Sequence, residues 1–169
     1  MTKRAEQFAA RFEAVNDEVI ATVMGCDEEQ WRQPCASEDW SVGVMAHHIA
    51  VVHRDFIGLV EALAAGETRS PGSSMRVVHR SNAQHARDYA AVGTPETLDA
   101  LRTHGAAIVH LLGSRGAAQL DRTAGVFGEQ ELRVAQVVER IVIGHAAVHL
   151  ASLRATLVDA AVRADGSRL

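Results

Sequence analysis

The chain has 169 residues, of which 47% are apolar, 22% are charged and only 4% are aromatic, and its formal net charge is −4. These proportions are typical of one globular domain, and they exclude intrinsic disorder and a fibrous architecture. Basic residues do not cluster anywhere, so we expect no nucleic-acid partner. We interpret residues 1–169 as a single domain.

Neither a membrane span nor a secretion signal is predicted. The longest apolar stretches are interrupted by His or Arg before the ~20 residues that a span needs, and residues 1–6 lack the apolar core of a signal peptide. A cytoplasmic location is therefore expected. The spacing of Cys26 and Cys35 fits no standard zinc or redox motif, so both are interpreted as ordinary thiols.

Apolar residues three or four apart predict two long helices in the first part of the chain. The first covers about residues 2–24 and ends at Gly25. A polar connection follows, and Ser41 is predicted to cap a second helix that runs to about residue 65 and stops at Gly66. A crossover containing Pro71 and Gly72 then leads to residues 75–91, whose helical pattern is weaker.

Two more long helices are predicted in the second part. Thr94 is expected to cap a helix over about residues 94–112, with Pro95 in its first turn. A loop containing Gly116, Gly125 and Gly128 leads to the last helix, at about residues 131–162. Four long amphipathic helices without an alternating strand pattern predict an all-α fold, a four-helix bundle. The long crossover between the second and third long helices is compatible with non-sequential helix pairing.

Histidines interrupt two stripes that should be apolar. The stripe of the second helix passes through His48 or Ile49, and that of the last helix passes through Ile141, His145, Val148 or His149, Ser152 and Ala155. Because His145 and His149 are four residues apart, their Cβ atoms should lie about 5 to 6 Å apart on one helix face. Of the nine histidines, His48 is the other one clearly on a core stripe of a long helix. Three imidazoles from two helices predict a site for one divalent transition metal with an open coordination position.

Alternatives to this ligand set remain open. His47 is rotated about 100° from His48 around the helix, and it is the ligand if the stripe is misassigned. In a third interpretation no metal binds and the three histidines are hydrogen-bonded in the core. Five histidines are interpreted as surface residues, although His85 shares a helix face with Asn82 and could line a pocket; they are His53, His79, His85, His104 and His110. Asp55 is interpreted as a solvated charge.

Several segments resemble the DinB superfamily. The stretch from Trp40 through Ser-Val-Gly-Val-Met-Ala to His48 places a histidine eight residues after a tryptophan, which resembles that superfamily's second-helix signature. Residues 138–154, with His145 and His149, resemble its last ligand helix, and Asn82 followed by Ala83 resembles a recurrent feature. The resemblance implies a four-helix bundle, often a homodimer, with metal-ligand roles for His48, His145 and His149.

The same resemblance implies a function. Relatives include the mycothiol-dependent maleylpyruvate isomerase and bacillithiol S-transferases, in which the metal is thought to bind a low-molecular-weight thiol and lower its pKa. The isomerase pattern has Glu where this chain has His145, so an isomerase is not expected. We predict a thiol-dependent S-transferase, in which a metal-bound thiolate, for instance of mycothiol, attacks a small electrophile. The metal is expected to be zinc, with nickel as the alternative, and the alternative function is a non-enzymatic metal-binding or stress-related role.

Overall fold

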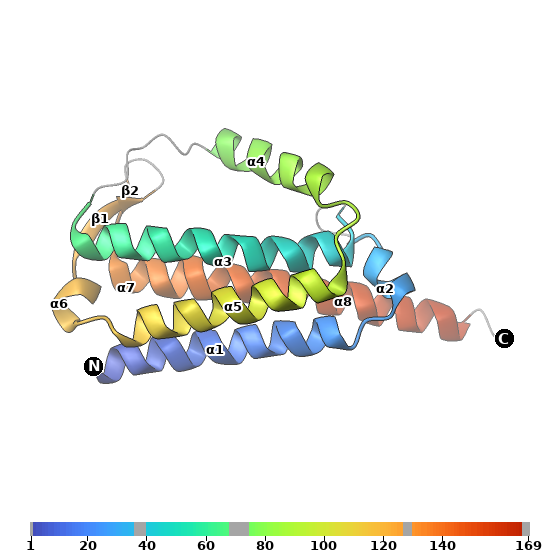
Figure 1. Cartoon of the computed structure of the whole chain (residues 1–169), viewed down its shortest axis with the longest axis horizontal. Coiled ribbons are helices and arrows are strands. Elements are labelled where there is room, and N and C mark those ends of the chain that lie inside the picture. Colours follow the sequence, from blue (N-terminus) through green and yellow to red (C-terminus); the bar gives the residue numbers. More distant parts are fainter. Residues whose placement is uncertain (1, 36–39, 68–74, 127–129, 167–169) are drawn as a thin grey trace.

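A computed structural model of the chain describes residues 2–35, 40–67, 75–126 and 130–166. Its long helices are α1 (Lys3–Met24), α3 (Val42–Ala65), α5 (Thr94–Gly113) and α8 (Gly144–Gly166). They pack side by side with their axes roughly aligned (Figure 1). The predicted all-α class and four-helix bundle are confirmed.

The order of the helices around the bundle is not their order in the chain. α1 and α3 each contact α5 and α8, so α1 and α3 are diagonal to one another. Figure 1 shows α3 and α5 running in the same direction, opposite to α1 and α8. Two parallel neighbours cannot share a tight turn, because the connection must span the ~36 Å length of a 24-residue helix. The crossover that does so contains α4 (Met75–Asp88), which lies over α3, and the non-sequential pairing is confirmed.

The helix ends follow local capping chemistry, with one correction. The Ser41 hydroxyl accepts a hydrogen bond from the Val44 N–H at 3.1 Å, and Gly66 ends α3 at a φ of 92°, which glycine adopts without steric cost. The prediction that Thr94 caps α5 is wrong. The N–H and the hydroxyl of Thr97 donate to the Gly93 carbonyl at 3.2 and 3.1 Å, so Gly93 occupies the capping position and Thr94 is the first residue of the helix, which begins at residue 94 as predicted.

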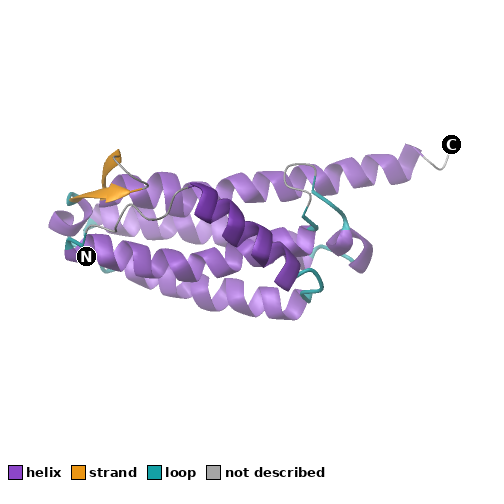
Figure 2. Ribbon diagram, turned by 90° about the horizontal axis from the view of Figure 1, so that it is seen from above, coloured by secondary structure: helices purple, strands orange, loops and turns teal. Residues whose placement is uncertain are grey.

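Short elements occupy segments that were expected to be loop. α2 (Glu28–Arg32) begins at a capping box between Asp27 and Gln30, and α6 (Ala117–Leu120) follows α5. An antiparallel hairpin of β1 (Thr123–Val126) and β2 (Gln130–Arg133) closes the end of the bundle near the N-terminus (Figure 2). Strands of four residues are too short to show an alternating pattern. Gly128 of the predicted loop lies outside the described residues.

The last helix starts later than predicted and contains an irregular turn. Residues 131–133 belong to β2, and the helical run consists of α7 (Val134–Val137), the π-helical segment η1 (Val138–Ile143) and α8. A π turn holds one more residue than an α turn, so the buried stripe beyond it is displaced by one position. Among the described residues beyond η1, the buried ones are Ala146, His149, Leu150, Leu153 and Thr156. Ala146, Leu153 and Thr156 each lie one place after an expected stripe residue, and of the two expected alternatives His149 is buried whereas Val148 is exposed.

One helical run meets the length and composition of a membrane span, namely Val134–Asp159 with 26 residues. Only a third of its most apolar window is buried in the bundle, where the run packs against α1 and α3. A core helix of a water-soluble bundle meets the same criteria. The run is therefore weak evidence for a membrane span.

We expect Gly43→Ala to destabilise the bundle, because an added Cβ would lie 2.6 Å from the indole ring of Trp31. The ring is held in place by a 2.9 Å hydrogen bond from its Nε1 to the Val92 carbonyl, so it cannot move away freely. Overpacking of this kind costs about 1–3 kcal/mol in the free energy of unfolding, measured by urea titration. Gly113→Ala is the control, because its Cβ would meet Ala9 at an ordinary 3.9 Å. Equal effects of the two substitutions would contradict the packing argument.

Candidate metal centre

Three imidazoles from two antiparallel helices converge in the interior of the bundle. Nε2 of His48 on α3 lies 3.2 Å from Nε2 of His145 on α8, and one ligating nitrogen from each of His48, His145 and His149 lies within 4.8 Å of the others. The ring centroids of His145 and His149 are 4.4 Å apart, as expected for residues one helical turn apart. We call these three residues the histidine triad.

Local structure explains how each helix presents its part of the triad. α3 is enclosed by other elements in its first half, so residues 42–50 are all buried, and His48 is 5% exposed. His145 and His149 lie just after η1, whose extra residue rotates the helix by about 100° relative to an uninterrupted α-helix. Because they are one helical turn apart, both rings lie against α3, with centroids 5.2 and 5.3 Å from that of His48.

Burial keeps His48 and His145 uncharged. Desolvation, together with the neighbouring histidines, lowers the pKa of His48 to about 2 and that of His145 to about 3. Neutral imidazoles retain a nitrogen lone pair, which is the form that binds metals. Nδ1 of His145 is buried and has no hydrogen-bond partner among the described residues. His48 and His145 therefore offer uncharged nitrogen donors to the site.

A cleft of about 460 Å³ opens from the triad between α3, α4 and α8. Its other lining residues are mostly apolar; they are Val51, Val52, Asp55, Phe56, Val77, Val78, Ser81, Asn82, His85 and Ile141. The Phe56 ring contacts His145 edge-on, with centroids 5.3 Å apart. A small molecule in this cleft would reach the triad directly.

Comparison with known proteins agrees with this architecture. The family model of the DinB superfamily matches residues 11–153. The chain belongs to the DinB superfamily. No curated protein matches it significantly. Among solved structures it is similar to YfiT from Bacillus subtilis, with a TM-score of 0.74 and 16% identity over 92% of this chain and 87% of that one. YfiT is described as a probable metal-dependent hydrolase with an unusual four-helix bundle topology, and at this identity the likeness shows the fold.

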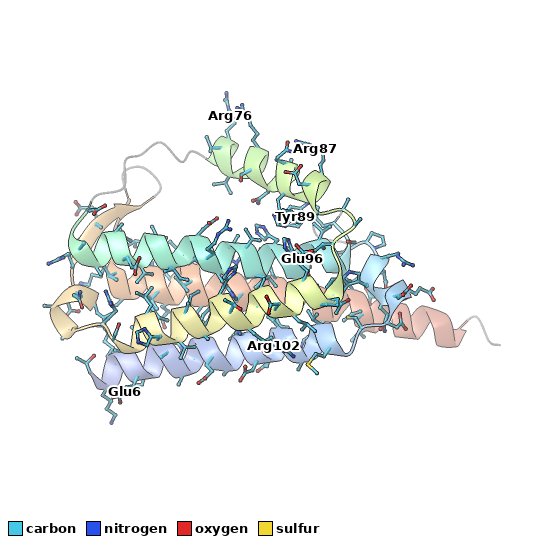
Figure 3. The ribbon with its side chains drawn as sticks, viewed as in Figure 1. Glu6, Arg76, Arg87, Tyr89, Glu96 and Arg102 are labelled. Atoms are coloured by element: carbon cyan, nitrogen blue, oxygen red, sulfur yellow. The ribbon has the colours of Figure 1, made fainter. Side chains whose placement is uncertain are left out.

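In this DinB-superfamily chain, His47 lies apart from the triad. It is buried against the crossover, with its ring centroid 4.1 Å from Tyr89 and 5.2 Å from His85. Figure 3 shows Tyr89 just after α4, between that segment and the bundle. The rotation of about 100° between adjacent residues thus directs His47 to α4 and His48 to α8. The geometry favours His48 over His47 as the third member of the site.

His85 was interpreted as a surface residue, and that prediction is wrong. It is half-buried, and its ring centroid lies 5.3 Å from that of His48 and 6.3 Å from that of Trp40. The expectation that His85 and Asn82 line a pocket is confirmed, because both line the cleft. In the sequence, only the shared helix face of Asn82 and His85 indicated that they line a pocket. The apolar pattern of α4 gave little further indication, because α4 packs on the bundle through few residues.

His53 is the second error among the surface histidines. Its side chain is fully buried, it contacts Phe12 edge-on at 4.9 Å, and neither ring nitrogen has a hydrogen-bond partner in the described part of the chain. The signal was present, because His53 lies four residues after Ile49 and three before Phe56 on the core stripe. His104 is half-buried and donates to the Ala50 carbonyl, whereas His79 and His110 are exposed as predicted.

His53 should make the fold sensitive to acid. Burial lowers its pKa from 6.5 to about 3, so below pH 6.5 the unfolded chain binds a proton that the folded chain does not. The stabilising effect of the neutral side chain is thus complete above pH 6.5 and is lost progressively as the pH falls toward 3. Between pH 7 and pH 5 the wild type should lose about 2 kcal/mol more unfolding free energy than His53→Phe, measured by urea titration.

The same titrations contain their own control. Between pH 7 and pH 8.5 the two proteins should differ by a constant amount, because His53 is neutral in both states of the wild type. Parallel stability curves from pH 8.5 down to pH 5 would show that the folded protein accepts the proton at His53 after all.

Proposed function

We propose that the histidine triad holds one divalent transition-metal ion, which activates a low-molecular-weight thiol to attack a small electrophile in the cleft. The observation that carries the proposal is the convergence of three imidazoles at the wall of an apolar cleft. A homodimer, a small-molecule substrate and a cytoplasmic location remain predictions of the sequence.

The residues fit such an ion. Two nitrogens bound tetrahedrally to zinc at about 2.05 Å lie about 3.3 Å apart, close to the 3.2 Å between Nε2 of His48 and Nε2 of His145. Three nitrogen donors favour zinc, nickel, copper or iron over magnesium and calcium, which prefer oxygen. Three protein ligands leave a coordination position for a molecule in the cleft, which is the arrangement of catalytic rather than structural zinc sites.

The chemistry follows from what surrounds the triad. A bound ion would act as a Lewis acid and lower the pKa of a thiol or water at its open position. Among the described residues, the potential metal-binding group contains no carboxylate, and Asp55 at the cleft is 66% exposed. A thiol needs only to lose its proton to become a strong nucleophile, whereas hydrolysis also requires protonation of many leaving groups. The absence of a carboxylic acid from the described triad therefore favours the thiol.

Two other functions follow from specific observations. The similarity in fold to YfiT, described as a probable metal-dependent hydrolase, favours a hydrolase as the second candidate. In that case the same cleft would bind an ester or amide, and water would replace the thiol. A non-enzymatic metal-binding or stress-related role requires only the triad, since metal binding adds to folding stability.

The metal is tested by elemental analysis of untagged protein that has been purified without a metal resin and reconstituted with zinc. We expect about one equivalent in the wild type, and a loss of at least tenfold in zinc affinity in His48→Ala, His145→Ala and His149→Ala, because two imidazoles bind weakly. His79→Ala, at an exposed histidine, is the matched control and should retain the ion. A wild type that holds no zinc after reconstitution would remove the basis of the proposal.

The reaction is tested with the zinc-loaded protein and two reagents. With mycothiol or cysteine and monobromobimane, the wild type should form the fluorescent thioether at least ten times faster than His145→Ala. With 4-nitrophenyl acetate and no thiol, we expect no rate above that of this variant. Ester cleavage without thiol dependence would support the hydrolase instead, and a zinc-loaded protein inactive in both assays would support the non-enzymatic role.

A further inference from the structure

The walls of the cleft are apolar on three sides. Val51, Val52 and Phe56 line it from α3, Val77 and Val78 from α4, and Ile141 from η1. Removing such surface from water favours binding by roughly 25 cal/mol per Å². The volume of about 460 Å³ lies within the range of about 300–1,000 Å³ that is typical of small-molecule sites. The cleft is therefore suited to a small molecule with a substantial apolar part.

Cationic side chains are directed away from this cleft. α4 carries Arg76, Arg80 and Arg87, all exposed, and Figure 3 shows Arg76 and Arg87 pointing from α4 away from the bundle. No described Arg or Lys lines the cleft. A carboxylate or phosphate on a ligand would thus lose its hydration without gaining a cationic partner from the protein, which is costly. The lining selects against anions.

The one acidic group of the lining does not make the cleft selective for cations. Asp55 is 66% exposed, and its carboxylate lies 3.8 Å from Nε of Arg54, so water and a neighbouring guanidinium screen its charge. An uncharged ligand consequently loses the least hydration free energy on entering the cleft.

Asn82 provides a polar group for such a ligand. It lies on α4 three residues before His85, is half-buried, and makes no hydrogen bond to any residue that the structure describes. Its carboxamide offers both a donor and an acceptor. These match an amide or carbonyl group on a ligand, and one such contact in an apolar site fixes the ligand's orientation.

We propose that the cleft binds an uncharged, largely apolar molecule carrying an amide or carbonyl group, and that Asn82 hydrogen-bonds this group. The inference rests on the proposed function in one respect, because it makes this molecule the substrate that faces the triad. It assigns α4 the role of a specificity wall, whose outer face is basic and whose inner face selects for neutral ligands.

The test uses three probes of the same size on the metal-free wild type: naphthalene-2-carboxamide, naphthalene-2-carboxylate and 2-naphthylmethylammonium. Binding is measured by isothermal titration calorimetry, so its outcome does not depend on whether the triad takes a metal. We expect the carboxamide to bind at least ten times more tightly than either charged probe. Equal or tighter binding of a charged probe, or no binding of the carboxamide, would overturn the proposal.

Two variants on α4 locate the effect, and far-UV circular dichroism checks that each folds. Asn82→Ala should weaken carboxamide binding about five- to tenfold, because it removes the hydrogen-bonding group. Val78→Arg should reverse the preference and favour the carboxylate, because it adds a cation to the wall. Val158→Arg, at an exposed valine outside the cleft, is the matched control and should leave all three affinities unchanged. A shift in the control as large as in Val78→Arg would show that overall charge, not the cleft, controls binding.

Discussion

Three imidazoles held together inside an apolar bundle impose the constraint on which the rest of the site depends. Burial prevents His48 and His145 from taking up protons at neutral pH, and each neutral ring still has one donor and one acceptor to satisfy. Contacts within the triad satisfy only part of this need, since Nδ1 of His145 remains buried without a hydrogen bond to a described residue. A cation shared by the three lone pairs would compensate for the burial. The same low-polarity surroundings would strengthen its effect on a bound thiol or water.

The arrangement of the helices places this triad next to a cleft, so the triad is not closed off from small molecules. Because α3 and α5 are parallel neighbours, the chain must return along the length of the bundle between them, and the returning segment forms α4. α4 meets α3 where His85 and Tyr89 pack on His47. The bundle thus supplies a rigid set of three histidines, while a separate helix supplies a wall whose side chains can vary without disturbing the core.

The π-helical segment connects the fold to the site. An insertion of one residue in a helix usually makes the geometry of its hydrogen bonds less favourable. Single π-helical turns of this kind are nevertheless frequent at functional sites. Here η1 ends two residues before His145, and Ile141 within it also lines the cleft. The displacement of the buried stripe by one position explains why His149, and not Val148, faces the interior. Val148 is instead 68% exposed.

The sequence by itself determined the helical class, most helix boundaries and the three histidines of the candidate site, because 3.6-residue periodicity, capping residues and i, i+4 spacing are local properties. It could not determine what depends on packing between distant segments. The burial of His53, the position of His85 beside His48 and the short hairpin arise only when the helices assemble. The displaced stripe depends on the π-helical hydrogen bonds of η1, and the residues of that segment give no sequence signal that predicts them. Tertiary structure alone therefore decided which face of α4 meets the triad, and with it the chemistry of the cleft.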